Sequence, residues 1–153
     1  MDRLELKVPP PGVALLAGLL MWGVARLGPL LAMPEGVRRG IAGVLMAMGI
    51  GIAVSALAQF WRARTTVHPE KPEKTSALVT TGIFRLTRNP MYVGLASVLL
   101  GWAVWLRAPW ALLGPALFML YIQRFQMVPE ERVLAGKFGE RYASYCRGVR
   151  RWL

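Results

Sequence analysis

The sequence predicts an all-α integral membrane protein with about four transmembrane helices, including a helix hairpin, followed by an amphipathic cytoplasmic tail helix. Composition is the first reason: 55% of the 153 residues are hydrophobic, only 18% are charged, and the mean hydropathy is +0.41. The second reason is that residues 12–33 and 40–61 are each apolar for about the 20 residues that cross a bilayer core. The chain length suits one domain, so residues 1–153 are expected to form a single membrane domain.

The first two predicted membrane helices are residues 12–33 and 40–61. The first range lacks a strongly basic leader and ends at Pro34 and Glu35, which does not match a cleaved signal peptide. The second range contains small residues three or four positions apart, a spacing that lets helices approach closely in lipid. These residues are Gly40, Gly43, Ala47, Gly51 and Ser55. We therefore expect a compact bundle or a homodimer.

The next two apolar runs, residues 91–106 and 110–128, predict a helix hairpin. The connection at 107–109 is so short that the two helices should be antiparallel. Tryptophans cluster near the tip of this hairpin, where an aromatic belt would meet the membrane surface. They are Trp102, Trp105 and Trp110.

Polar segments flank the hairpin on both sides. Residues 62–90 form a long polar connection, and loops of that length are usually functional or mobile. Residues 129–153 form a basic tail with one apolar helical face. That face comprises Leu134, Phe138, Tyr142 and Tyr145. A basic amphipathic helix of this kind can lie in the membrane interface.

The formal net charge of +11 is distributed unevenly along the chain. Most of the 19 lysines and arginines lie near the N-terminus, in residues 62–90, and from Arg124 onward. The positive-inside rule then places both termini and the 62–90 loop in the cytoplasm, beside anionic lipid. No nucleic-acid-binding motif accompanies the charge, so no nucleic-acid partner is expected. The single Cys146 and the single His68 predict neither an internal disulfide nor a metal site.

The stretch GIFRLTRNPMYVG, residues 82–94, places polar side chains directly before an apolar helix. Arg88 and Asn89 precede the helix start, where unpaired backbone N–H groups favour an anion. Arg85 fits an interfacial anchor and a binding residue equally well. In the tail, Glu130 and Glu131 are either ion-paired with neighbouring arginines or part of a binding site.

Two motifs, taken together and in order, resemble the isoprenylcysteine carboxyl methyltransferase family. They are RNPMYVG at residues 88–94, and EERVL at 130–134 with Phe138-Gly139, Tyr142 and Tyr145 following. The upstream turn at 81–84 resembles the GPY-like turn of the family, although Phe84 lacks the tyrosine hydroxyl. The match covers roughly residues 76–153. It implies an integral membrane enzyme that transfers a methyl group from S-adenosylmethionine to a lipophilic acceptor, such as an isoprenylcysteine carboxylate, a lipid amine or a thiol.

The resemblance also implies that the cofactor lies between the loop before the hairpin and the segment after it. The residues assigned to it are Val79, Gly82, Ile83, Asn89, Tyr92, Gly94, and either Glu130 or Glu131. Arg88 joins them because a guanidinium pairs with a carboxylate. Asn89 replaces the histidine of many members and so cannot carry its charge. Tyr92 or Tyr142 would face the sulfonium as a cation–π partner.

Arg124 is the single catalytic candidate. It precedes Glu131 by seven residues, which places both on one face of a regular helix, where Arg124 would orient the acceptor. A long arginine side chain that reaches the membrane interface explains Arg124 equally well. Two other functions stay open at this point. One is an NADPH enzyme that reuses the same cofactor cradle, as in membrane sterol reductases. The other is a non-catalytic protein that binds membrane lipid or scaffolds a complex.

Overall fold

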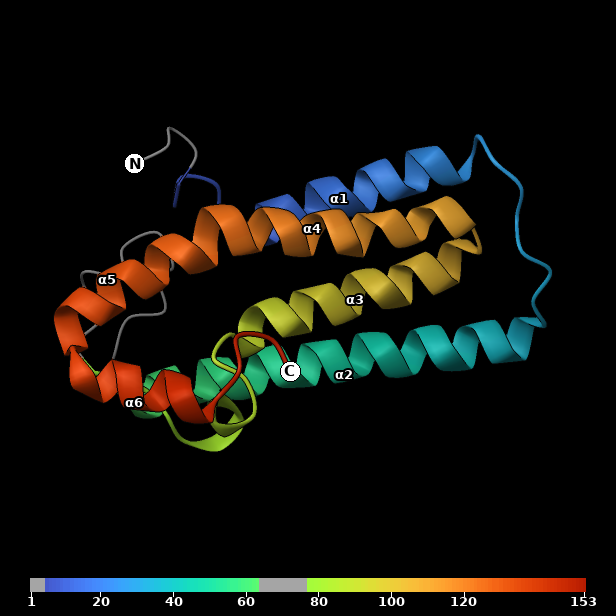
Figure 1. Cartoon of the computed structure of the whole chain (residues 1–153). Coiled ribbons are helices and arrows are strands. Elements are labelled where there is room, and N and C mark those ends of the chain that lie inside the picture. Colours follow the sequence, from blue (N-terminus) through green and yellow to red (C-terminus); the bar gives the residue numbers. More distant parts are fainter. Residues whose placement is uncertain (1–4, 64–76) are drawn as a thin grey trace.

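The computed structural model describes residues 5–63 and 77–153, and these residues form helices without any strand. Four helices run along a bundle (Figure 1): α1 Pro10–Ala25, α2 Glu35–Arg62, α3 Pro90–Leu106 and α4 Leu113–Ile122. A π-helical turn, Gln123–Met127, leads from α4 into α5, Val128–Phe138. Helix α6, Glu140–Gly148, follows, and short 3-10 turns span Gly82–Arg85 and Pro109–Leu112. The predicted all-helical class is confirmed.

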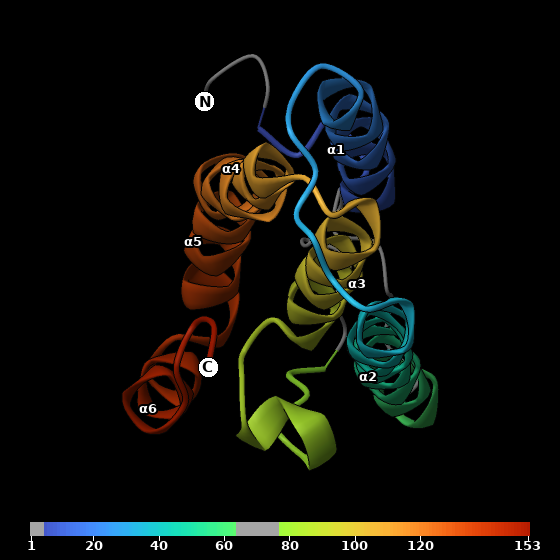
Figure 2. The same ribbon diagram turned by 90° about the vertical axis from the view of Figure 1, so that its right-hand side faces the viewer.

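Helix α3 is the central element of the bundle. It contacts α1, α2 and α4, and these three helices surround it in the end-on view of Figure 2. The buried core between them includes Met21, Leu99, Phe118 and Ile122. Helix α3 begins at Pro90, whose fixed φ and missing N–H suit the first helical position. It therefore places the residues just before Pro90 at one end of the bundle.

Three observed helix bounds differ from the predicted ranges. Helix α1 ends at Ala25 rather than continuing to residue 33, and the residues after it include Gly28 and Pro29. Helix α2 extends past both ends of 40–61. The tail at 129–153 is two helices rather than one, because the chain turns at Gly139 with φ +51. Part of the predicted loop 62–90, including His68, lies outside the described residues.

Close packing of α2 against α3 depends on a different set of small residues from the one expected. A Cβ atom added at Gly49 would meet the carbonyl oxygen of Gly94 at 2.5 Å, and one added at Gly94 would meet that of Gly49 at 2.6 Å. The expected stripe is instead exposed, so its packing within this bundle was wrongly predicted. It comprises Gly40, Gly43, Ala47, Gly51 and Ser55. The homodimer stays a prediction.

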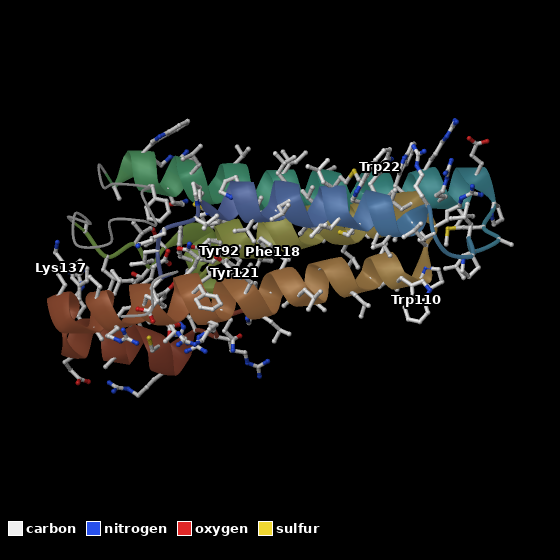
Figure 3. The ribbon with its side chains drawn as sticks, turned by 90° about the horizontal axis from the view of Figure 1, so that it is seen from above. Trp22, Tyr92, Trp110, Phe118, Tyr121 and Lys137 are labelled. Atoms are coloured by element: carbon white, nitrogen blue, oxygen red, sulfur yellow. The ribbon has the colours of Figure 1, made fainter. Side chains whose placement is uncertain are left out.

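Within the described residues, two helices are long and apolar enough to cross a membrane, Glu35–Arg62 and the continuous helical stretch Pro109–Phe138. Two shorter apolar helices are Pro10–Ala25 and Pro90–Leu106. Large apolar side chains on α1, α2 and α4 are exposed, as expected for surfaces that face lipid. Trp22 and Trp110 lie at the end of the bundle opposite Lys137 (Figure 3), where tryptophans favour an interface.

We predict that two alanine substitutions in α2 differ in their effect on the free energy of unfolding. Gly49→Ala should lower the free energy of unfolding by about 1–3 kcal/mol, because its methyl group would push α2 away from α3. Gly51→Ala, which has open space around it, should be neutral or stabilising by up to about 1 kcal/mol. Thermal unfolding in detergent measures both, and equal behaviour of the two variants would contradict the close contact.

Candidate functional site

The last residues of the chain are fixed against the start of α3. The backbone N–H of Arg88 donates to the carbonyl oxygen of Arg150 at 2.9 Å. The Asn89 side-chain amide donates to the carbonyl oxygen of Arg151, also at 2.9 Å, and the Thr87 hydroxyl reaches the same oxygen at 3.2 Å. Thr87 additionally accepts the backbone N–H of Asn89 at 3.2 Å. The C-terminal segment therefore satisfies polar groups that precede the helix.

The carboxylate of Glu131 lies between two guanidinium groups. Arg151 donates to it through Nε at 2.9 Å and through Nη2 at 2.6 Å, a bidentate geometry. Arg88 Nη1 lies 3.1 Å from Oε1 of the same carboxylate. The side chains of Arg88 and Glu131 are only 14% and 18% exposed. The hydrogen bond with Glu131 raises the pKa of Arg151. Two guanidinium groups face one carboxylate, so the formal charges of the three side chains sum to one positive charge.

Arg88 has a hydrogen-bond donor that is not used. Its Nη1 donates to Sγ of Cys146 at 2.8 Å, in addition to the Glu131 contact. Its Nε is buried and has no hydrogen-bond partner among the described residues. Buried hydrogen-bond donors are nearly always paired in folded proteins. The unpaired Nε of the Arg88 guanidinium is therefore a candidate donor to an anionic ligand.

Glu130 has a different environment from its neighbour Glu131. It accepts a hydrogen bond from the hydroxyl of Tyr92, which links the first turn of α5 to the first turn of α3. Tyr92 is only 6% exposed. No guanidinium pairs with Glu130 within the part of the chain that the structure describes. Of the two adjacent acidic residues, Glu131 is paired with two guanidinium groups, whereas burial raises the pKa of Glu130 to about 8, so the Glu130 carboxyl is largely protonated at neutral pH.

Helix α6 covers the same cluster from the other side. The Tyr145 hydroxyl donates to the backbone carbonyl of Phe84 at 2.6 Å, and Cys146 contacts Arg88. Tyr142 is buried, and its ring centre lies 6.4 Å from that of Tyr145. Burial raises the pKa of both phenols well above the usual value, so both are neutral at ordinary pH.

The predicted residues of the upstream turn lie against the end of α2. Val79 is half-buried before the 3-10 turn, and Gly82 and Ile83 lie within that turn. Gly82 has φ +59, and a Cβ atom there would lie 2.3 Å from the Gln59 amide. The turn is connected to the cluster through Phe84, whose carbonyl oxygen accepts the Tyr145 hydroxyl. Arg85 is exposed, which favours an anchoring role for it.

Two expected site residues point elsewhere. Arg124 pairs with Glu5 at 3.2 Å, on the side of the N-terminal segment, rather than with Glu131. The π-helical turn at 123–127 accounts for this, because it breaks the regular spacing that would place residues seven apart on one face. Gly94 contacts Gly49 of α2, so its open side is occupied by helix packing and not by a ligand pocket.

A family model described as phospholipid methyltransferase matches residues 37–141. The chain belongs to the phospholipid methyltransferase family. This family falls in the same group of membrane methyltransferases as the isoprenylcysteine carboxyl methyltransferases, so the resemblance seen in the sequence is confirmed. Membership indicates a membrane methyltransferase.

An uncharacterized protein of Haemophilus influenzae is 46% identical over 63 residues, which make up 41% of this chain and 100% of the relative. No solved structure matches the chain. The family match ends at residue 141, so most of α6 and the C-terminal segment lie beyond it.

Sequence reasoning missed three residues of this cluster: Thr87, Cys146 and Arg151. Thr87 lies within the RLTRNP stretch, and its position two residues before Asn89 is a local signal for a side-chain-to-backbone hydrogen bond. Cys146 is the single cysteine of the chain, and its position in the basic tail gives no sign of a contact with Arg88. Arg151 is one of many tail arginines, and no spacing in the sequence distinguishes it from Arg150.

We predict that Glu131→Gln destabilises the protein more than Glu140→Gln. Glu131 is a partly buried carboxylate with two cationic partners, and its removal leaves the charge of Arg88 without a counter-ion. The expected loss in the free energy of unfolding is about 2 kcal/mol. Glu140 forms an exposed pair with Arg147, so its loss should cost about 0–1 kcal/mol. Equal shifts in thermal unfolding of the two purified variants would contradict the special role of Glu131.

We also predict alkaline destabilisation from the tyrosines of α6. Their pKa values are raised in the folded chain, so above about pH 10 the unfolded chain releases these protons first and the folded state loses stability. Tyr142→Phe should reduce the slope of unfolding free energy against pH in this range. An unchanged slope in chemical denaturation series would show that Tyr142 does not titrate abnormally.

Proposed function

We propose that this protein is an S-adenosylmethionine-dependent methyltransferase that acts on a lipophilic acceptor. The observation that carries this proposal is the unpaired, buried Nε of Arg88 in a cluster with one net positive charge. The amino-acid end of S-adenosylmethionine contains a carboxylate and an ammonium group, next to a sulfonium cation. A site for it needs a cationic partner and a carboxyl group that can lose its proton to the ligand, and Arg88 and Glu130 both lie beside the start of α3.

Arg88 is the residue proposed to bind the carboxylate, because a guanidinium makes strong charge-assisted hydrogen bonds to it. Glu130 is proposed to accept hydrogen bonds from the ammonium group or the ribose hydroxyls. We favour Glu130 over Glu131 because Glu131 is already held by two guanidinium groups. Asn89 donates its amide to the C-terminal segment, which leaves its side-chain oxygen to accept from the ligand.

The bound cofactor would supply an activated methyl group on its sulfonium. The protein then has to hold the acceptor in line with that group and to exclude water, so catalysis consists mainly of positioning. Tyr92 and Tyr142 are buried phenols next to the charged cluster, and their ring faces suit a sulfonium. A carboxylate or thiolate acceptor is already nucleophilic, so such a substrate needs no general base at the site.

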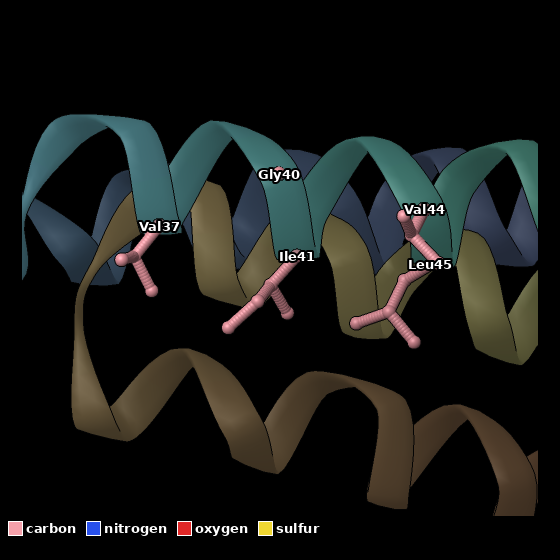
Figure 4. Close-up of a pocket in the computed structure, with 5 residues that line it drawn as sticks. All are labelled: Val37, Gly40, Ile41, Val44 and Leu45. Atoms are coloured by element: carbon pink, nitrogen blue, oxygen red, sulfur yellow. The ribbon is translucent and has the colours of Figure 1, made fainter.

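The proposed acceptor is lipophilic because apolar surface dominates the bundle. An open hollow of about 420 Å³ along the first third of α2 is lined entirely by apolar side chains and a glycine (Figure 4). Val37, Ile41 and Leu45 project into it. The hollow lies beside the C-terminal end of α3, away from Arg88, so it illustrates the apolar surface of the bundle and is not the place of methyl transfer. In our proposal α1 to α4 cross the bilayer with both termini on the cytoplasmic side, and the acceptor enters laterally from lipid. A carboxylate, an amine and a thiol all remain candidate acceptor groups.

We predict that the detergent-purified protein binds S-adenosylmethionine and S-adenosylhomocysteine, which calorimetry measures directly. Glu130→Gln should weaken binding about tenfold, since the buried carboxyl can lose its proton to pair with the ammonium group and the amide cannot. Glu140→Gln is the matched control and should bind as the wild type does, because Glu140 is exposed and lies on α6. Binding of NADPH alone would favour a reductase. No binding of any of these compounds to folded protein would favour a scaffold.

A further inference from the structure

The C-terminal segment connects the two elements that carry the candidate site. Arg150 and Arg151 accept hydrogen bonds from residues just before α3 through their carbonyl oxygens. The Trp152 indole donates to the side chain of Gln123 at 2.9 Å, at the beginning of the π-helical turn that leads to α5. This segment, Arg150–Trp152, lies beyond the family match and beyond every residue expected from the sequence motifs.

We propose that Arg151 is a positioning residue that keeps Arg88 available for the carboxylate of the cofactor, an inference that rests on the function proposed above. The proposed effect of Arg151 is electrostatic. The single negative charge of Glu131 can neutralise one arginine, and its Oε1 lies 3.1 Å from Nη1 of Arg88. Arg151 takes both oxygens of the same carboxylate at 2.9 and 2.6 Å.

The sign of the effect follows from the charge of the cluster. With Arg151 present, two guanidinium groups share one carboxylate, and a net positive charge remains beside the unpaired Nε of Arg88. Without Arg151, Glu131 and Arg88 form a one-to-one pair with no net charge. An anion binds less well to a neutral pair than to a cationic cluster, especially where solvent screening is weak.

Arg150 provides a matched control for Arg151. The two residues are adjacent and have the same charge, and both contribute a backbone carbonyl to the residues before α3. The side chain of Arg150 is exposed, whereas that of Arg151 reaches Glu131. Arg150→Ala therefore removes one tail charge, as Arg151→Ala does, and it preserves the backbone contacts. Unlike Arg151→Ala, it leaves the ion pair with Glu131 intact.

The test compares two ligands, S-adenosylmethionine and its decarboxylated analogue, by calorimetry on wild type, Arg151→Ala, Arg151→Lys and Arg150→Ala. For S-adenosylmethionine we expect Arg151→Ala to raise Kd about tenfold, as for the loss of a charge-assisted contact. Arg151→Lys keeps the charge and should recover binding to within about threefold of the wild type. Arg150→Ala should bind as the wild type does. The decarboxylated analogue lacks the group that Arg88 would hold, so none of the three substitutions should weaken its binding.

Two results would overturn the proposal while leaving the proposed function intact. If Arg151→Ala binds S-adenosylmethionine as tightly as the wild type or more tightly, the C-terminal segment is neutral or competes with the cofactor. If Arg151→Ala weakens both ligands equally, its role is to support the fold and not to adjust the charge at Arg88. Absence of binding to wild-type protein would instead refute the proposed function itself, and the role of Arg151 with it.

Discussion

The carboxylate of Glu131 holds together three segments that are far apart in the sequence. It receives Arg88 from the start of α3 and Arg151 from the C-terminus, while it is itself carried by α5. A partly buried ion pair needs several hydrogen bonds to offset the desolvation of its charges, and the bidentate contact with Arg151 supplies them. Backbone contacts of the C-terminal segment and the hydrogen bond from Tyr145 to Phe84 hold the same parts, and Glu131 is the charged group at which the three segments meet.

Helix packing and the π-helical turn direct the remaining groups around that carboxylate. The contact of Gly49 with Gly94 brings α2 against α3. Gly94, which the motif assigned to the ligand, is therefore part of a helix contact instead. The π-helical turn turns Arg124 toward Glu5 and lets the backbone carbonyl of Phe125 accept the N–H of Leu6 at 3.1 Å. Such turns occur frequently at functional sites because they redirect side chains without ending the helix.

Adjacent residues in this site have separate roles because their neighbours differ. Glu130 and Glu131 follow one another in the first turn of α5, yet one contacts a phenol and the other contacts two guanidinium groups. The result is a region in which a cationic cluster and a buried carboxyl that binds its proton tightly lie a short distance apart. This arrangement suits a zwitterionic ligand at the polar end of an otherwise apolar bundle, in a family of membrane methyltransferases.

The sequence by itself determined the helical class, the apolar character of the bundle and the family. These depend on composition, on hydropathy over long windows and on local motifs such as RNPMYVG, all of which are properties of contiguous residues. It could not determine which of Glu130 and Glu131 is neutralised, where Arg124 points, or that Arg151 belongs to the cluster. Those outcomes depend on contacts between residues about 20 to 120 positions apart, such as Arg151 with Glu131 and Arg124 with Glu5. Only the tertiary structure decides them, because an irregular turn or a folded-back terminus changes which side chains meet without leaving a periodic signal in the sequence.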